Sequence, residues 1–320
     1  MKIIYLDQNK WIDLLKSIVK PNEYPKYIDI ANLIQNKVDS GEWIFPLSLI
    51  HFMETSSRAD VGSREKLAHV MSSISKNWSI QSYVDIEGDE FLNSFAELHD
   101  VTKKVEIQAV RKNLLSALGI EHVEIQCQDH IPEDMKEDLK ELIKNTTSGE
   151  NFFTLFMAYT NDPALIASFQ RGDKESKKEW ENLQTQMAKL PKKHKYKPFL
   201  LINFLSQFNL FNKQLQGVFQ KTNEEIIPTQ LLSDKNRVIK FLESIPSLNV
   251  RTKILYEILK DPDRPIHIHD NRDLTFLSTA IPYCDVVITE NTWKHPVKLH
   301  GLDSKYSTII ENDLNCLLTL

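Results

Sequence analysis

Two short apolar runs, one near each end of the 320-residue chain, are each followed directly by a carboxylate. "IIYL" at 3–6 precedes Asp7, and "VVIT" at 286–289 precedes Glu290. Short runs rich in β-branched and aromatic residues are typical of strands buried in a parallel sheet. A buried first strand needs partners on both sides, and the second run is the segment that resembles it most. We therefore expect both ends of the chain to share one sheet, with Asp7 and Glu290 at the same edge.

The residues after the first run alternate between helix and strand patterns. Apolar residues recur at helical spacing over 27–38, and "WIFPLS" at 43–48 indicates a second short buried strand. A helix that carries Glu54 among apolar neighbours follows it. This strand–helix–strand–helix order predicts a parallel sheet.

The same pattern returns near the other end of the chain. A helix is predicted from Asp270 or Asp273 to Ala280, with a break at Pro282, before the second run. A last short strand and a closing helix are expected after it. The long middle segment is almost wholly helical in pattern. We therefore predict a three-layer α/β domain with a mainly parallel sheet, formed by residues 1–80 and 245–320 and interrupted by a large α-helical insert over 81–244.

Composition narrows the function classes. The net charge of −5 argues against a protein that coats nucleic acid with its whole surface, but it allows a local basic groove. The chain has no glycine-rich phosphate-binding loop of either common pattern. Its three cysteines are scattered, no apolar stretch approaches the roughly 20 residues of a membrane span, and the first apolar run is too short for a signal peptide. We expect a cytoplasmic protein without a membrane partner.

Acidic residues at corresponding places in the α/β ends form the candidate site. Clustered carboxylates without compensating cations repel one another by several kcal/mol, which favours binding of a hard metal ion. Taken singly, each acid has another reading: Asp7 and Asp273 as helix caps, Glu54 as a solvated helix residue, and Glu290 as an acid stabilised by a helix N-terminus. Asp285, before the second strand, is expected at the opposite end of the sheet.

In the order and spacing of these acids the chain resembles the PIN-domain nucleases. The motifs that carry the resemblance are "YLDQN", an early helical acid, and "NRDLTFLSTAIPYCDVVITENTW". Glu290 stands where the family more often has aspartate. The resemblance implies catalytic and metal-ligating roles, with Mg²⁺ or Mn²⁺ as the cofactor, for Asp7, Glu54, Asp273 and Glu290. Asn9 matches the family's small polar residue, and Asp270 shares a helical face with Asp273, so both are expected to support the ligands.

The resemblance implies hydrolysis of phosphodiester bonds by a metal-bound water, with single-stranded RNA favoured over DNA as the substrate. The insert contains a basic and aromatic stretch that suits phosphates and bases, although a solvated linker between helices is the favoured interpretation of it: Lys192, Lys193, Lys195 and Tyr196. The alternative function is a catalytically weak or inactive module that binds nucleic acid or protein. In that case the helical insert would be the docking surface for a partner or a second copy.

Overall fold

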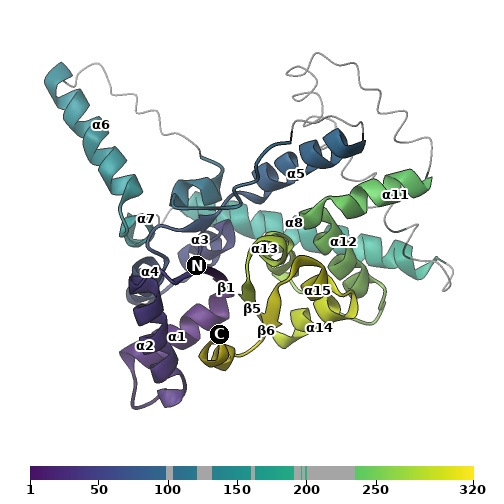
Figure 1. Cartoon of the computed structure of the whole chain (residues 1–320), viewed down its shortest axis with the longest axis horizontal. Helices are drawn as coiled ribbons and strands as arrows, with labels where there is room; N and C mark the ends of the chain where they lie inside the picture. Colours follow the sequence, from purple (N-terminus) through teal and green to yellow (C-terminus); the bar gives the residue numbers. More distant parts are fainter. Residues whose placement is uncertain (99–103, 121–131, 160–162, 191–195, 197–198, 200–234) are drawn as a thin grey trace.

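The centre of the molecule is a four-stranded parallel sheet. The computed structural model describes the whole chain except residues 99–103, 121–131, 160–162, 191–195, 197–198 and 200–234 (Figure 1). The strand order is β2-β1-β5-β6. The strands are β1 (Lys2–Leu6), β2 (Trp43–Ile44), β5 (Val286–Ile288) and β6 (Ile309–Glu311). The prediction of a mixed α/β fold with a parallel sheet is confirmed.

The first and last parts of the chain pair directly. Ile4 stands opposite Val286 and Leu6 opposite Ile288 in the parallel β1–β5 pair. The backbone N–H of Asp7 continues this ladder by donating to the Ile288 carbonyl at 2.9 Å. Parallel pairing places the carboxyl ends of both strands at one edge, so Asp7 and Glu290 lie where the sequence predicts.

Alternation along the strands divides the core between the two faces of the sheet. Ile4 and Leu6 belong to one buried apolar cluster, and Tyr5 belongs to the other. Helices α1 (Gln8–Val19), α2 (Ile28–Asp39) and α4 (Val61–Ser75) supply the first cluster. Helices α12 (Pro246–Leu259), α13 (Asp270–Tyr283) and α14 (Asn291–Leu299) supply the second. Figure 1 shows the two groups of helices on opposite sides of the strands. Because both faces are covered, the strands are apolar at nearly every position.

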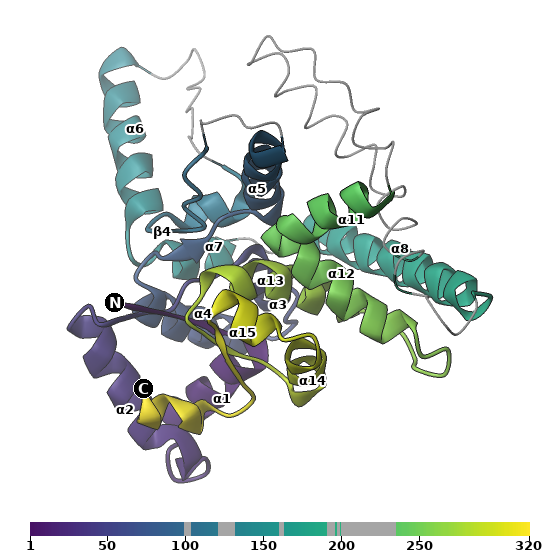
Figure 2. The same ribbon diagram turned by 45° about the vertical axis from the view of Figure 1, so that its right-hand side comes forward.

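The described part of the middle segment is mainly helical. Its helices are α5 (Tyr83–Leu98), α6 (Glu133–Ser148), α7 (Phe152–Tyr159), α8 (Pro163–Ala188) and α11 (Lys235–Ser244). Helix α7 contributes to the first core and α8 to the second, whereas α6 extends away from the sheet (Figure 2). A small antiparallel pair joins β3 (Ser79–Ile80) to β4 (Val110–Arg111) across the expected boundary. The division at 80/81 and 244/245 stays a prediction.

The remaining elements are short. They are α3 (Leu49–Ser56), α15 (Leu302–Tyr306) and the 3₁₀ turns Pro25–Tyr27, Leu114–Leu118 and Leu314–Thr319. The expected break at Pro282 is wrong, because α13 continues to Tyr283. A proline near a helix end removes only one hydrogen bond, and the Cys284 amide still donates to the Ala280 carbonyl at 2.9 Å. Within the described residues, no helix combines the length and the apolar character needed to cross a membrane.

Candidate active site

Asp7 follows β1 and is 5% exposed at the edge of the sheet. It occupies the N-cap position of α1, yet its side chain makes no capping hydrogen bond. Its Oδ2 instead accepts a hydrogen bond from the Thr289 hydroxyl at 3.2 Å, which links the ends of β1 and β5. Burial and the charge of Glu290 raise the pKa of the Asp7 carboxyl to about 6. The backbone amide of Asn9, in the first turn of α1, acts in the opposite direction and lowers this pKa, so the carboxyl still faces the start of the helix.

Glu290 lies at the N-cap position of α14 and also makes no capping hydrogen bond with its side chain. Its Oε1 accepts from the Asn9 amide at 2.6 Å. Asn9 thus connects the start of α1 to the second acid of the edge, as a supporting residue of the ligands would. Two polar links, Thr289 to Asp7 and Asn9 to Glu290, tie the strand ends together.

Glu54 is carried by α3, which a buried histidine holds against the end of β1. The Ser48 amide donates to His51 Nδ1 at 2.9 Å, so His51 Nε2 carries the proton and donates to the Leu6 carbonyl at 2.9 Å. Burial lowers the pKa of His51 to about 4, so the ring is neutral at pH 7. Burial and the charge of Asp7 raise the pKa of Glu54 to about 7. The histidine thereby holds the helix that carries Glu54 against the residue that precedes Asp7.

Asp273 lies in the first turn of α13, whose N-cap residue is His269. Asp270 supports the preceding turn, because its Oδ2 accepts from the His267 amide at 3.0 Å. Among the described residues, no hydrogen-bond donor satisfies the Asp273 carboxyl. Burial, followed by the charges of Asp7, Glu54, Glu290 and Asp270, raises the pKa of Asp273 to about 9.

The four acids repel one another at one edge of the sheet. The charge of Asp7 raises the pKa of both Glu54 and Asp273, and Glu290 acts on all three. A further acid of this edge, Glu311 at the end of β6, differs because Lys294 pairs with it at 2.5 Å. Oxygen ligands of this kind are the donors that Mg²⁺ and Mn²⁺ prefer.

The fit to a metal is partial. Within the described part of the chain, no three His, Cys, Asp or Glu side chains form a ready group for a metal ion. The residues present supply the chemistry of a hard-cation site without the closed ligand geometry.

A buried ion pair stands beside the acids. Arg272, next to Asp273 on α13, donates from Nε to Asp173 Oδ1 at 2.9 Å and from its terminal nitrogen to Oδ2 at 2.6 Å. Asp173 comes from α8, and no local pattern in the sequence signals this partnership. The sequence analysis also did not identify His51 and Thr289 as site residues. For Thr289, its place as a polar residue at the end of an apolar strand could have indicated a role in the site.

The predicted substrate-contacting residues receive little support. Lys192, Lys193 and Lys195 lie outside the described residues. The Tyr196 ring packs edge-on against Tyr256, with centroids 5.0 Å apart, and its hydroxyl donates to Glu243 at 3.4 Å. This ring is engaged in packing between helices, and its role in base stacking stays a prediction.

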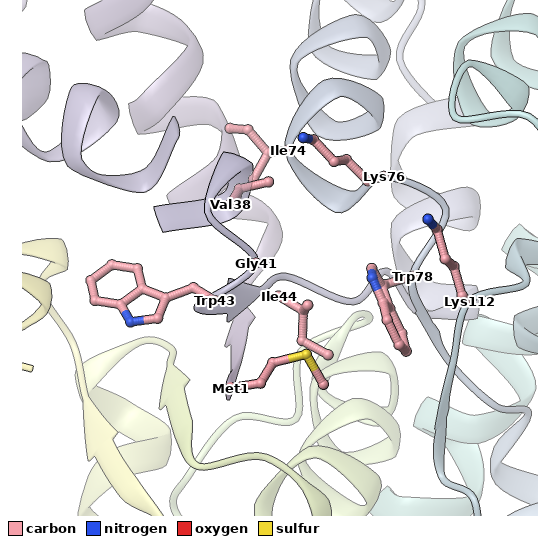
Figure 3. A pocket seen from close by; sticks show the side chains of 9 residues that line it. All are labelled: Met1, Val38, Gly41, Trp43, Ile44, Ile74, Lys76, Trp78 and Lys112. Atoms are coloured by element: carbon pink, nitrogen blue, oxygen red, sulfur yellow. The ribbon is translucent and has the colours of Figure 1, made fainter. Parts of the chain in front are cut away.

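Two features of the opposite edge lie away from the acids. Asp285 Oδ2 accepts from the Ile3 amide at 2.7 Å, as expected for a structural residue at the amino end of β5. A cavity of about 190 Å³ opens near the amino end of β1 (Figure 3). Its walls are mostly apolar, with two lysines: Met1, Val38, Gly41, Trp43, Ile44, Ile74, Lys76, Trp78 and Lys112. No titratable group of the acid cluster lines it.

No family model, curated protein or solved structure matches the chain.

Proposed function

We propose that the chain is a metal-dependent nuclease with a PIN-like three-layer fold, which hydrolyses phosphodiester bonds of single-stranded RNA. The observation that carries the proposal is the raised pKa of three acids, Asp7, Glu54 and Asp273, through burial and mutual repulsion. Strongly perturbed acids that share one edge of a parallel sheet are a mark of functional sites. The helices on both faces of the sheet support the three-layer assignment, and the preference for RNA comes from the resemblance.

In this proposal Asp7, Glu54, Asp273 and Glu290 hold the cation. A bound Mg²⁺ or Mn²⁺ supplies a Lewis acid and lowers the pKa of a coordinated water. Thr289 and Asn9 orient the carboxylates of Asp7 and Glu290. Because metal ligands must be deprotonated, Asp273 and Glu54 would have to release their protons to hold a cation near neutral pH.

The test is cleavage of labelled single-stranded RNA and DNA with Mn²⁺ by the wild type and by Asp7→Asn. Asp285→Asn is the matched control, because it makes the same charge change at the opposite end of the sheet. We expect Asp7→Asn to lose cleavage by orders of magnitude and Asp285→Asn to keep it. Equal cleavage by the wild type and Asp7→Asn would contradict the proposal.

The second candidate is a binding module without chemistry. The absence of a ready metal-binding group among the described residues favours it. So does α6, which extends from the sheet and exposes Met135 by 53% and Leu142 by 61%. Under this function the wild type would bind RNA or a protein and cleave no RNA with any divalent cation.

A further inference from the structure

Helix α8 belongs to the middle segment and packs against both helices that carry site acids, α3 and α13. Its Trp180, Leu183 and Met187 are buried in the second core. The Gln184 amide donates to the carbonyls of Asp261 at 2.7 Å and Arg264 at 2.9 Å, in the loop before α13. These contacts fix α8 beside the site.

The main polar contact of α8 with α13 is the pair of Asp173 and Arg272. Both residues are 4% exposed, and two parallel hydrogen bonds join them. His269 Nδ1 approaches the same carboxylate at 3.8 Å, and the Asn271 amide donates to Ser176 Oγ at 3.3 Å one turn further along α8. Two-point contact of this kind fixes the guanidinium in both distance and plane.

The pair acts electrostatically on the acids. Arg272 and Asp173 both lie close enough to Glu54 for their charges to act on its carboxyl. Arg272 also precedes Asp273 in the sequence, and two of its donor groups bind a carboxylate outside the ligand set. A free guanidinium in this place would compete with a metal ion for Glu54, because both cations favour its deprotonated carboxylate.

We propose that Asp173 is a positioning residue of the metal site, which holds the Arg272 cation away from Glu54 and so leaves this carboxylate to the metal ion. The inference rests on the proposed function. It also gives α8 a role in the site, because the carboxylate that binds Arg272 comes from this helix in the middle of the chain. Asp173 touches neither substrate nor metal and acts through Arg272.

The test measures Mn²⁺ binding directly, by calorimetric titration of the full chain, and thus without reference to cleavage. Asp173→Asn removes the charge that holds Arg272, and we expect Mn²⁺ affinity to fall about 10–100-fold, the range over which partners of ligand residues act. The double variant Asp173→Asn/Arg272→Gln removes the competing cation as well. Its affinity should return to within about threefold of the wild type, well inside the loss set by that range.

Glu87→Gln is the matched control. Glu87 comes from α5 in the middle segment and pairs with Arg251 of α12 at 2.9 Å, with its side chain 2% exposed. A purely structural role predicts the same pattern for both buried pairs: a lower unfolding temperature with unchanged Mn²⁺ affinity. We expect this pattern for Glu87→Gln alone.

The outcomes separate the two proposals. If the wild type binds Mn²⁺ in a manner that Asp7→Asn abolishes, but Asp173→Asn binds equally well, the role of Asp173 is overturned and the proposed function stands. A double variant that binds no better than Asp173→Asn overturns it too. If Asp173→Asn does not fold, the double variant decides, because a more than tenfold loss of affinity in it would contradict competition by Arg272. A wild type without Asp7-dependent Mn²⁺ binding overturns both proposals.

Discussion

Replacement of Asp273 by asparagine should stabilise the metal-free protein at neutral pH. The ordinary pKa of the group is 3.8 and the folded structure raises it to about 9, so the folded chain holds a proton that the unfolded chain releases. Stability from this group is therefore fully present below pH 4 and is lost as the pH rises toward 9. Between pH 4 and pH 7 lie about three pH units, which at about 1.4 kcal/mol each set an upper limit of about 4 kcal/mol.

Screening by solvent reduces that limit, and we expect Asp273→Asn to gain about 2 kcal/mol in the free energy of unfolding at pH 7. The assay is urea unfolding in EDTA at pH 4.5 and pH 8, with Asp285→Asn as the control. The gain should be small at pH 4.5, larger at pH 8 and absent in the control. With saturating Mn²⁺ the order should reverse, because only the wild type keeps the full ligand set. A variant that is less stable than the wild type at pH 8 in EDTA would refute the repulsion argument.

Three further predictions follow from the same structure. Asp7→Ala should cost less than the about 1 kcal/mol of a lost helix cap, since Asp7 makes no capping hydrogen bond; thermal unfolding in EDTA checks this, and a full capping loss would contradict it. His51→Phe removes the donor to the buried Leu6 carbonyl and should lower the free energy of unfolding in urea by about 1–3 kcal/mol. It should also lower Mn²⁺-dependent cleavage. An unchanged cleavage rate would show that the histidine does not position Glu54. Burial raises the pKa of Glu90 to about 7, so this residue contributes to the free energy of unfolding at low pH and loses that contribution as the pH rises through 7. Glu90→Gln should therefore destabilise the protein more at pH 5.5 than at pH 8.5 in urea unfolding. The opposite order would exclude a raised pKa.

The sequence predicted the parts of the fold that local pattern controls. Strand and carboxylate are adjacent in the chain at Asp7 and at Glu290, so strand direction alone placed both acids at one edge. The break predicted at Pro282 was wrong because a proline in the sequence does not show how far the helix continues beyond it. The local pattern around Glu54 could not show that His51 fixes its helix to β1.

Contacts between distant segments were beyond sequence reasoning. Asp173 and Arg272 are 99 positions apart, and each reads as an ordinary helix surface residue in its own segment. Their burial depends on where α8 crosses α13. Tyr196 reads as an exposed ring among lysines, whereas the fold packs it on Tyr256. In each case tertiary packing decides whether a polar or aromatic side chain meets solvent.

The pairing of β1 with β5 has a consequence for synthesis of the protein. The Ile3 amide and its Asp285 acceptor are separated by 282 positions, so the opening strand waits for its central partner until almost the whole chain is made. At about 5–20 residues per second, a ribosome needs about 15 seconds to a minute to cover that distance. The nascent chain lacks Glu290 throughout this time and Asp273 for nearly all of it, and its apolar first strand has one edge without its native neighbour. A growing or prematurely released chain is thus unable to assemble the acid cluster, and the activity proposed here would begin only after translation of the segment that carries β5.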